Sequence, residues 1–146
     1  MPRLTSAQFM LALPTAVRER LPAPLQTFKS ATRGWLCQLY YRDPQLHYEV
    51  WNLGERRGLL EIGLHFESRN RETNVALLNG FRQHMIEVKA TLGIQWEAEP
   101  WDKGWTKVYE TIPAEPFSAD LLDRVSGRLA RTITVLTPIW DEVQKR

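Results

Sequence analysis

The sequence contains a single cysteine, no long apolar run and no signal-like N-terminus. Cys37 has no second cysteine to pair with, so an internal disulfide and a cysteine-based zinc site are both excluded. No stretch approaches the ~20 apolar residues of a membrane-spanning helix, and the first residues lack the basic-then-apolar pattern of a secretory signal. We therefore expect a cytoplasmic protein that does not associate with membranes.

An excess of charge of either sign is also missing. Lys and Arg number 19 against 17 Asp and Glu, a formal net charge of +2, which is too small to predict a dedicated polyanion-binding protein. The 43% hydrophobic and 25% charged content is typical of a globular protein. A length of 146 residues fits one domain, in which we expect an N-terminal helical segment, 1–33, and a sheet with two long helices, 34–146.

No motif that defines a catalytic chemistry is present. Glu87-Val88-Lys89 resembles the acidic–x–Lys end of restriction-type active sites, but that chemistry requires the pair at the end of a strand. Here the predicted context is the middle of a helix, with Val88 on its buried side, so we reject this interpretation. We expect no cofactor and favour a protein that is not an enzyme.

The clearest structural signal is a change of apolar spacing between Leu59 and Gly93. The first part has a period of two, which predicts a half-buried strand over 59–67. The apolar residues of this strand are Leu60, Ile62, Leu64 and Phe66. After residue 70 the steps become three or four, which predicts one long amphipathic helix that ends at Gly93. Its stripe consists of Leu77, Phe81, Met85, Val88 and Leu92.

The N-terminal region predicts a further helix. A capping box that begins at Thr5 starts a helix over about 6–20, and Pro14 predicts a kink within it. A short helical turn over 25–32 can follow. Four more strands are predicted over 35–42, 46–53, 94–98 and 105–112.

A last helix completes the fold. Ser118 caps it, and Pro138 predicts that its regular part bends or ends near Thr137. The order of elements is then α-βββ-α-ββ-α. Because short hairpins imply antiparallel pairing, the predicted fold class is α+β: a five-stranded antiparallel sheet with long helices packed mainly on one face.

The apolar pattern also predicts the register of the hairpin around residues 54–58. A slip of one residue would exchange the two faces of the sheet, so apolar residues must lie opposite apolar ones. A register that places the two glycines of the loop opposite each other pairs Val50 with Ile62 on an apolar face. It also pairs His47 with His65 on the other face.

That other face carries the side chains best suited to chemistry: His47, Glu49, Glu61, His65 and Glu67. Two imidazoles with neighbouring carboxylates could bind Zn²⁺ or Mn²⁺, or serve as acid and base. The competing interpretation is the solvated face of an antiparallel sheet, where His and Glu are common. We favour the solvated face, because no His–Glu spacing in this sequence matches a known ligand motif.

Basic and aromatic residues offer a weak nucleic-acid signature. The basic residues are Arg56 and Arg57 at a hairpin tip and Arg69 and Arg71 at a helix start. A strand of about nine residues, ~30 Å, separates the two pairs, so they do not form one groove, although the helix start could bind a phosphate. Trp105, Lys107 and Tyr109 share a strand face and could stack bases, while a core or a protein interface is the commoner role of such rings.

The helices offer a possible partner surface. Arg124, Arg128 and Arg131 line the face of the last helix opposite its apolar stripe, and Val135 falls on that same face. Val75 and Ile86 likewise fall outside the stripe of the central helix. Single exposed apolar residues are normal, but together these predict that part of the helical layer contacts another chain or a second copy.

Several short motifs occur in a definite order along the chain: Trp35-Leu36, Leu60-Glu61-Ile62-Gly63-Leu64, Leu92-Gly93, Ile94-Gln95-Trp96-Glu97 and Leu136-Thr137-Pro138-Ile139. In these motifs and in its order of elements the sequence resembles a family of uncharacterised prokaryotic domains, often found at the C-terminal end of chains with a restriction-nuclease-like N-terminal part. The resemblance implies the fold, and no catalytic residues. The nuclease-like part is not in this sequence, so a role in defence would require a separate partner.

We therefore expect a non-catalytic binding module, a protein-interaction subunit of a multi-subunit prokaryotic assembly, with a protein partner or a second copy. One alternative is a nucleic-acid-binding accessory of a defence or restriction-type system. The other is a metal-dependent hydrolase that uses the His/Glu face.

Overall fold

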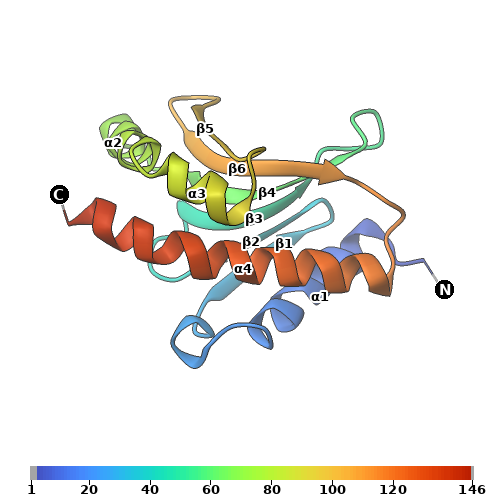
Figure 1. Cartoon of the computed structure of the whole chain (residues 1–146). Helices are drawn as coiled ribbons and strands as arrows, with labels where there is room; N and C mark the ends of the chain where they lie inside the picture. Colours follow the sequence, from blue (N-terminus) through green and yellow to red (C-terminus); the bar gives the residue numbers. More distant parts are fainter. Residues whose placement is uncertain (1–2, 146) are drawn as a thin grey trace.

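A computed structural model describes residues 3–145 and contains one antiparallel sheet with the strand order β1-β2-β3-β4-β6-β5 (Figure 1). The strands are β1 (Lys29–Arg33), β2 (Leu36–Tyr40), β3 (Leu46–Asn52), β4 (Leu59–Phe66), β5 (Glu97–Pro100) and β6 (Thr106–Pro113). The helices are α1 (Ser6–Arg18), α2 (Arg71–Arg82), α3 (Met85–Leu92) and α4 (Ala119–Gln144), with a 3₁₀ turn η1 (Ala23–Leu25). The predicted α+β class is confirmed, but the sheet of the described chain has six strands instead of five.

The additional strand is β1. It pairs with β2 in antiparallel register and occupies the end of the N-terminal segment 1–33, where a short helical turn over 25–32 was the expectation. The only helical turn described there is η1, so that expectation is wrong for residues 29–32. Four of the five residues of β1 are exposed, and the strand shows no alternation of apolar and polar residues. Its place in the sheet comes from backbone hydrogen bonds at an edge, which leave no apolar period in the sequence.

Two helices replace the single long helix predicted after β4. α2 ends at Arg82, and His84 has φ −108° and ψ 4°, outside the helical region, before α3 begins. Phe81 and Val88 are both fully buried, one on each side of the break. The apolar stripe therefore continues across an interruption that its spacing does not reveal.

Prolines do not interrupt the other helices. α4 continues through Pro138 to Gln144, so of the predicted bend or end near Thr137 the end is wrong, and Pro14 lies inside α1. Leu136 and Ile139 are buried on either side of Pro138, and this packing offsets the one backbone hydrogen bond that a proline removes. The predicted caps are confirmed: Thr5 forms a capping box, and Ser118 accepts a hydrogen bond from the Leu121 amide at 3.1 Å.

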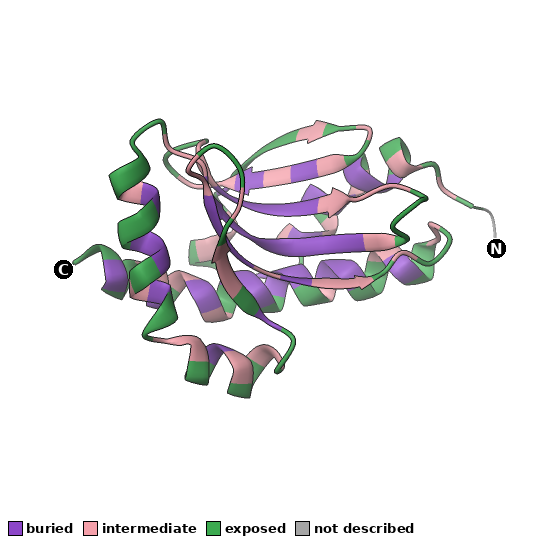
Figure 2. Ribbon diagram, turned by 90° about the horizontal axis from the view of Figure 1, so that it is seen from above, coloured by how far each residue is buried: buried purple, intermediate pink, exposed green. Residues whose placement is uncertain are grey.

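The β3–β4 hairpin has the predicted register, with Val50 opposite Ile62 and His47 opposite His65. α1 and α4 lie against one face of the sheet, and in Figure 2 the central strands are mostly buried. Seven of the eight residues of β4 are buried, which means that both of its faces are covered. No helix in residues 3–145 combines the length and the apolar character needed to cross a lipid bilayer.

Candidate functional site

The five ionisable residues of β3, β4 and the residue after β4 form one compact group, here called the His/Glu cluster: His47, Glu49, Glu61, His65 and Glu67. The expectation that these side chains face water is wrong. His65 is 0% exposed, and His47 and Glu61 are each 2% exposed. The loop between β5 and β6 causes this burial, because the Trp101 ring lies over the cluster, 5.6 Å from the His65 ring. The part of the sheet face that carries these residues, which looks solvated in the sequence, is thereby closed.

His47 is held in one orientation by a backbone contact. Its Nδ1 lies 2.8 Å from the carbonyl oxygen of Pro44, which can only accept a hydrogen bond, so Nδ1 donates. The other ring nitrogen, Nε2, faces two carboxylates: Glu49 Oε1 at 3.2 Å and Glu67 Oε1 at 3.7 Å.

His65 lies between carboxylates on both sides of its ring. Nε2 is 2.6 Å from Glu61 Oε2, and Nδ1 is 2.9 Å from Glu67 Oε2. Burial lowers the pKa of His65, but the charge of Glu49 and the hydrogen bonds to Glu61 and Glu67 outweigh it and raise the pKa to about 10. When no metal ion is bound, His65 is therefore an imidazolium at neutral pH.

Glu49 and Glu61 accept hydrogen bonds from separate donors. Burial raises the pKa of Glu49, yet the charge of His65 and hydrogen bonds from His47 and Gln38 outweigh it and bring the pKa to about 2. The Gln38 amide donates to Glu49 Oε1 at 3.0 Å. Lys107 Nζ donates to Glu61 Oε1 at 2.6 Å, with both side chains at most one-tenth exposed.

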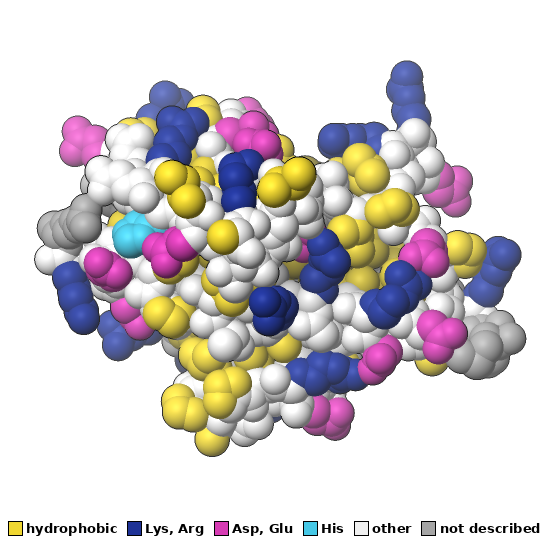
Figure 3. Space-filling model, in the orientation of Figure 1, with side chains coloured by type: hydrophobic (Ala, Val, Ile, Leu, Met, Phe, Trp, Pro, Cys, Tyr) yellow, Lys and Arg dark blue, Asp and Glu magenta, His cyan; other side chains and the backbone are white. Residues whose placement is uncertain are grey.

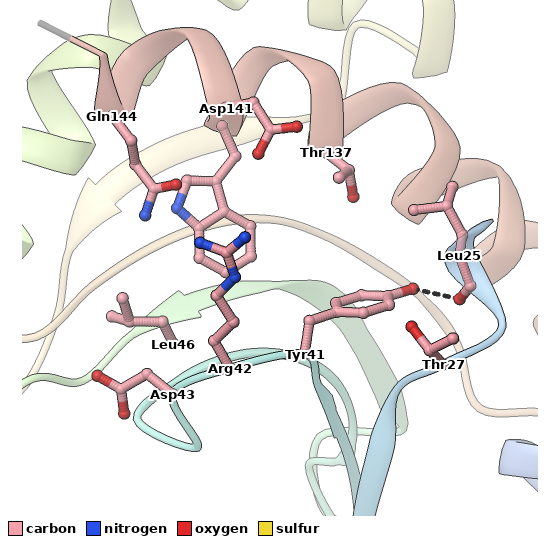
Figure 4. Close-up of a pocket in the computed structure, with 10 residues that line it drawn as sticks. Leu25, Thr27, Tyr41, Arg42, Asp43, Leu46, Thr137, Asp141 and Gln144 are labelled. Atoms are coloured by element: carbon pink, nitrogen blue, oxygen red, sulfur yellow. Dashed lines mark hydrogen bonds between the residues drawn. The ribbon is translucent and has the colours of Figure 1, made fainter.

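The largest described cavity lies elsewhere, at the C-terminal end of α4, and is here called the α4 cleft (Figure 4). Its volume is about 490 Å³. The residues that line it are Leu25, Thr27, Tyr41, Arg42, Asp43, Leu46, Thr137, Trp140, Asp141 and Gln144. They come from η1 and the residues just after it, the β2–β3 turn with the first residue of β3, and α4, so no local sequence pattern connects them or predicts this site.

The walls of the α4 cleft differ in polarity. Leu25, Leu46 and Trp140 are partly buried and pack against the core, whereas Arg42 and Asp141 are exposed. The Tyr41 hydroxyl is already engaged, because it donates to the Leu25 carbonyl at 2.7 Å (Figure 4). Trp140 Nε1 is a buried donor without a hydrogen-bond partner among residues 3–145.

The residues of the proposed nucleic-acid signature are only partly available. The Lys107 ammonium is buried against Glu61, and the Tyr109 hydroxyl donates to Glu99. Trp105 is half-buried and packs on Trp101, with ring centroids 5.3 Å apart. The four arginines Arg56, Arg57, Arg69 and Arg71 are exposed. Glu87-Val88-Lys89 lies within α3, as the rejection of a restriction-type site requires.

The proposed partner surface is also partly occupied by contacts within the chain. Arg124 pairs with Glu115, Arg128 pairs with Glu110, and Arg131 donates to the Thr91 carbonyl. The expectation that Val135 lies on the outer face is wrong, since it is partly buried against the core. Val75 and Ile86 are exposed, at 47% and 88%, and so is Ile94, at 85%. Figure 3 shows basic side chains along α4 and only isolated hydrophobic ones over α3.

No protein-family model, curated protein or solved structure matches this chain. What the chain can do must therefore follow from its own geometry. The His/Glu cluster has the chemical groups of a metal or acid–base site but little access, and the α4 cleft has access but no group with activated chemistry. None of the five residues of the His/Glu cluster lines the α4 cleft.

Proposed function

We propose that this chain is a non-catalytic binding module, a protein-interaction subunit of a multi-subunit prokaryotic assembly, and that the α4 cleft receives the partner. The observation that carries the proposal is the construction of the cleft, which has an apolar floor, a charged rim and a volume of about 490 Å³. That volume lies within the ~300–1,000 Å³ range of binding pockets in proteins. The prokaryotic setting is part of this proposal, because it comes from the resemblance of the sequence to a family of prokaryotic domains.

A peptide segment of a protein partner matches the groups of the cleft. An apolar side chain would cover Leu46 and Trp140, as anchor residues do at interface hot spots. Arg42 and Asp141, which are exposed and oppositely charged, would select the charges that flank the segment.

The hydrolase alternative has less support from the geometry. A hydrolytic site must admit a substrate and a water molecule to its acid and base. His47 and His65 are almost completely buried, and Trp101 covers His65. A closed cluster of this kind can hold an ion more readily than it can turn over a substrate.

The nucleic-acid alternative relies on the four exposed arginines. Arg56 and Arg57 follow β3 and Arg69 precedes α2, so β4 separates the two pairs as predicted. Retention on DNA or RNA that falls steeply with salt, and that is lost on reversing these charges, would favour this alternative over a protein partner.

The test uses the chain as bait in its native host, with partners quantified by mass spectrometry. The cleft variant combines Arg42→Glu with Gln144→Trp, two exposed positions that line the cleft. The matched control is Arg56→Glu, a charge reversal at an exposed position on the β3–β4 loop. We expect one partner whose recovery falls at least tenfold with the cleft variant and is unchanged with the control.

Two results would contradict the proposal. The first is a partner recovered equally with all three proteins. The second is a chain that is monomeric in solution and recovers no partner from its host.

A further inference from the structure

We propose that the His/Glu cluster is a binding site for one divalent transition-metal ion, foremost Zn²⁺, with His47, Glu49, His65 and Glu67 as its ligands. Each of these residues offers one ligand atom, and the four atoms lie within 4.8 Å of one another. The site is independent of the α4 cleft, so it can exist whether or not the cleft binds a partner.

The distances between neighbouring donor atoms suit a shared ion. They are 3.2 Å from His47 Nε2 to Glu49 Oε1, 3.7 Å from His47 Nε2 to Glu67 Oε1, and 2.9 Å from His65 Nδ1 to Glu67 Oε2. Ligands at ~2.0–2.2 Å from a tetrahedral or octahedral ion are themselves about 2.9–3.6 Å apart. The 3.2 and 2.9 Å distances lie in this range and the 3.7 Å distance lies just above it, so these pairs need only small movements. The four atoms, which lie within 4.8 Å of one another, would draw together around the ion.

The groups behind these ligands already orient them. The hydrogen bond from His47 Nδ1 to the Pro44 carbonyl leaves Nε2 as the nitrogen that faces the carboxylates. His65 has a carboxylate beside each ring nitrogen, so whichever nitrogen binds the ion, the other one has an acceptor. Glu49 is held by Gln38. Outer contacts of this kind are typical of metal-binding histidines and carboxylates.

The charges of the cluster also suit a divalent ion. Glu49, Glu61 and Glu67 bring three negative charges, and Lys107 brings one positive charge, all in or beside a nearly buried space. One divalent cation with two neutral imidazoles would balance them. When the ion binds, the proton of the His65 imidazolium is released to solvent.

The donor set selects the class of metal. Two imidazole nitrogens and two carboxylate oxygens suit Zn²⁺ or Mn²⁺, whereas Ca²⁺ and Mg²⁺ prefer oxygen donors alone. Because Trp101 covers His65, the ion would be enclosed and would join β3 to β4. We therefore assign it a structural role.

The test uses the full chain without a histidine tag, stripped with EDTA and titrated with ZnCl₂ by calorimetry. We expect one Zn²⁺ per chain and a higher melting temperature in its presence. His47→Gln and Glu67→Gln remove proposed ligands and should abolish binding, while Glu61→Gln removes only a supporting group and should weaken it about 10- to 100-fold. The matched control is His84→Gln, because His84 lies before α3 and pairs with Glu87, outside the cluster.

A second measurement covers variants that do not fold. Co²⁺ added to the wild-type chain should give visible absorption bands of nitrogen and oxygen coordination. In NMR spectra, addition of Zn²⁺ should shift the imidazole resonances of His47 and His65 but not those of His84. The proposal is overturned if the folded wild type binds neither Zn²⁺ nor Co²⁺ at ~100 μM, or if the ligand variants bind as tightly as the His84→Gln control.

Discussion

Removal of the Lys107 ammonium should expose how much the buried ion pair beside the His/Glu cluster contributes to stability. Lys107 Nζ lies 2.6 Å from Glu61 Oε1, and the two side chains are 10% and 2% exposed. At that distance and an effective dielectric constant of ~20, the attraction is about 6 kcal/mol, much of which offsets the cost of desolvating both groups. Lys107→Met keeps the aliphatic stem but leaves the carboxylate without its ammonium.

We expect Lys107→Met to lower the free energy of unfolding by about 3–5 kcal/mol, because one partner of a buried pair is left uncompensated. With a urea m-value of about 2 kcal/mol/M, the midpoint would fall by about 1.5–2.5 M. His65, 2.6 Å from the other oxygen of Glu61, keeps the loss from being larger. The assay is urea unfolding followed by tryptophan fluorescence, with EDTA present so that no metal contributes.

The control for this prediction is Arg124→Met, which breaks an ion pair with Glu115 whose side chains are 57% and 51% exposed. An exposed pair contributes about 0–1 kcal/mol, so the control should change little. The double variant Lys107→Met with Glu61→Gln should be less destabilised than the sum of its single changes, because neither then leaves a buried charge. If Lys107→Met costs no more than the exposed control, the pair is not buried as described and the reasoning fails.

Further predictions concern pH, backbone packing and the thiol. In the metal-free chain, the raised pKa of His65 contributes stability that is complete below pH 6.5 and is lost as pH rises toward about 10. The lowered pKa of Glu49 contributes stability that is complete above pH 4.5 and is lost as pH falls toward about 2. Melting temperatures across this range should therefore peak between the two windows, and a flat profile from pH 7 to 10 would contradict the description of His65. Gly63→Ala should lower stability by about 1–3 kcal/mol, because its Cβ would lie 2.5 Å from a carbonyl oxygen of β6. Gly127→Ala, with nothing within 4 Å, should raise stability by up to about 1 kcal/mol, and urea unfolding of the two variants in parallel checks the opposite signs. Burial, with a smaller effect of Glu49, raises the pKa of Cys37 to about 12, so we expect native protein to resist iodoacetamide that labels the unfolded chain, as measured by intact mass.

The sequence by itself determined the parts of the fold that depend on local periodicity. Alternation in β4 and the glycines of its loop were sufficient for the register of the hairpin, because any slip would have moved Val50 and Ile62 out of the apolar face. The caps of α1 and α4 were equally local, since each depends on a side chain within three residues of the amide it binds.

Two features of the fold leave no mark in the apolar pattern and were decided by the tertiary structure. β1 exists because its backbone pairs with β2, a contact that requires no apolar pattern. The break at His84 leaves the buried stripe intact and therefore leaves the periodicity unchanged.

The same limit applies to both candidate sites. Register placed His47 beside His65, but only the fold of the β5–β6 loop put Trp101 over them and turned a polar sheet face into a buried cluster. The α4 cleft draws on three separate segments, from Leu25 to Gln144. Burial of a side chain depends on what packs over it, and that packing is a property of the whole chain.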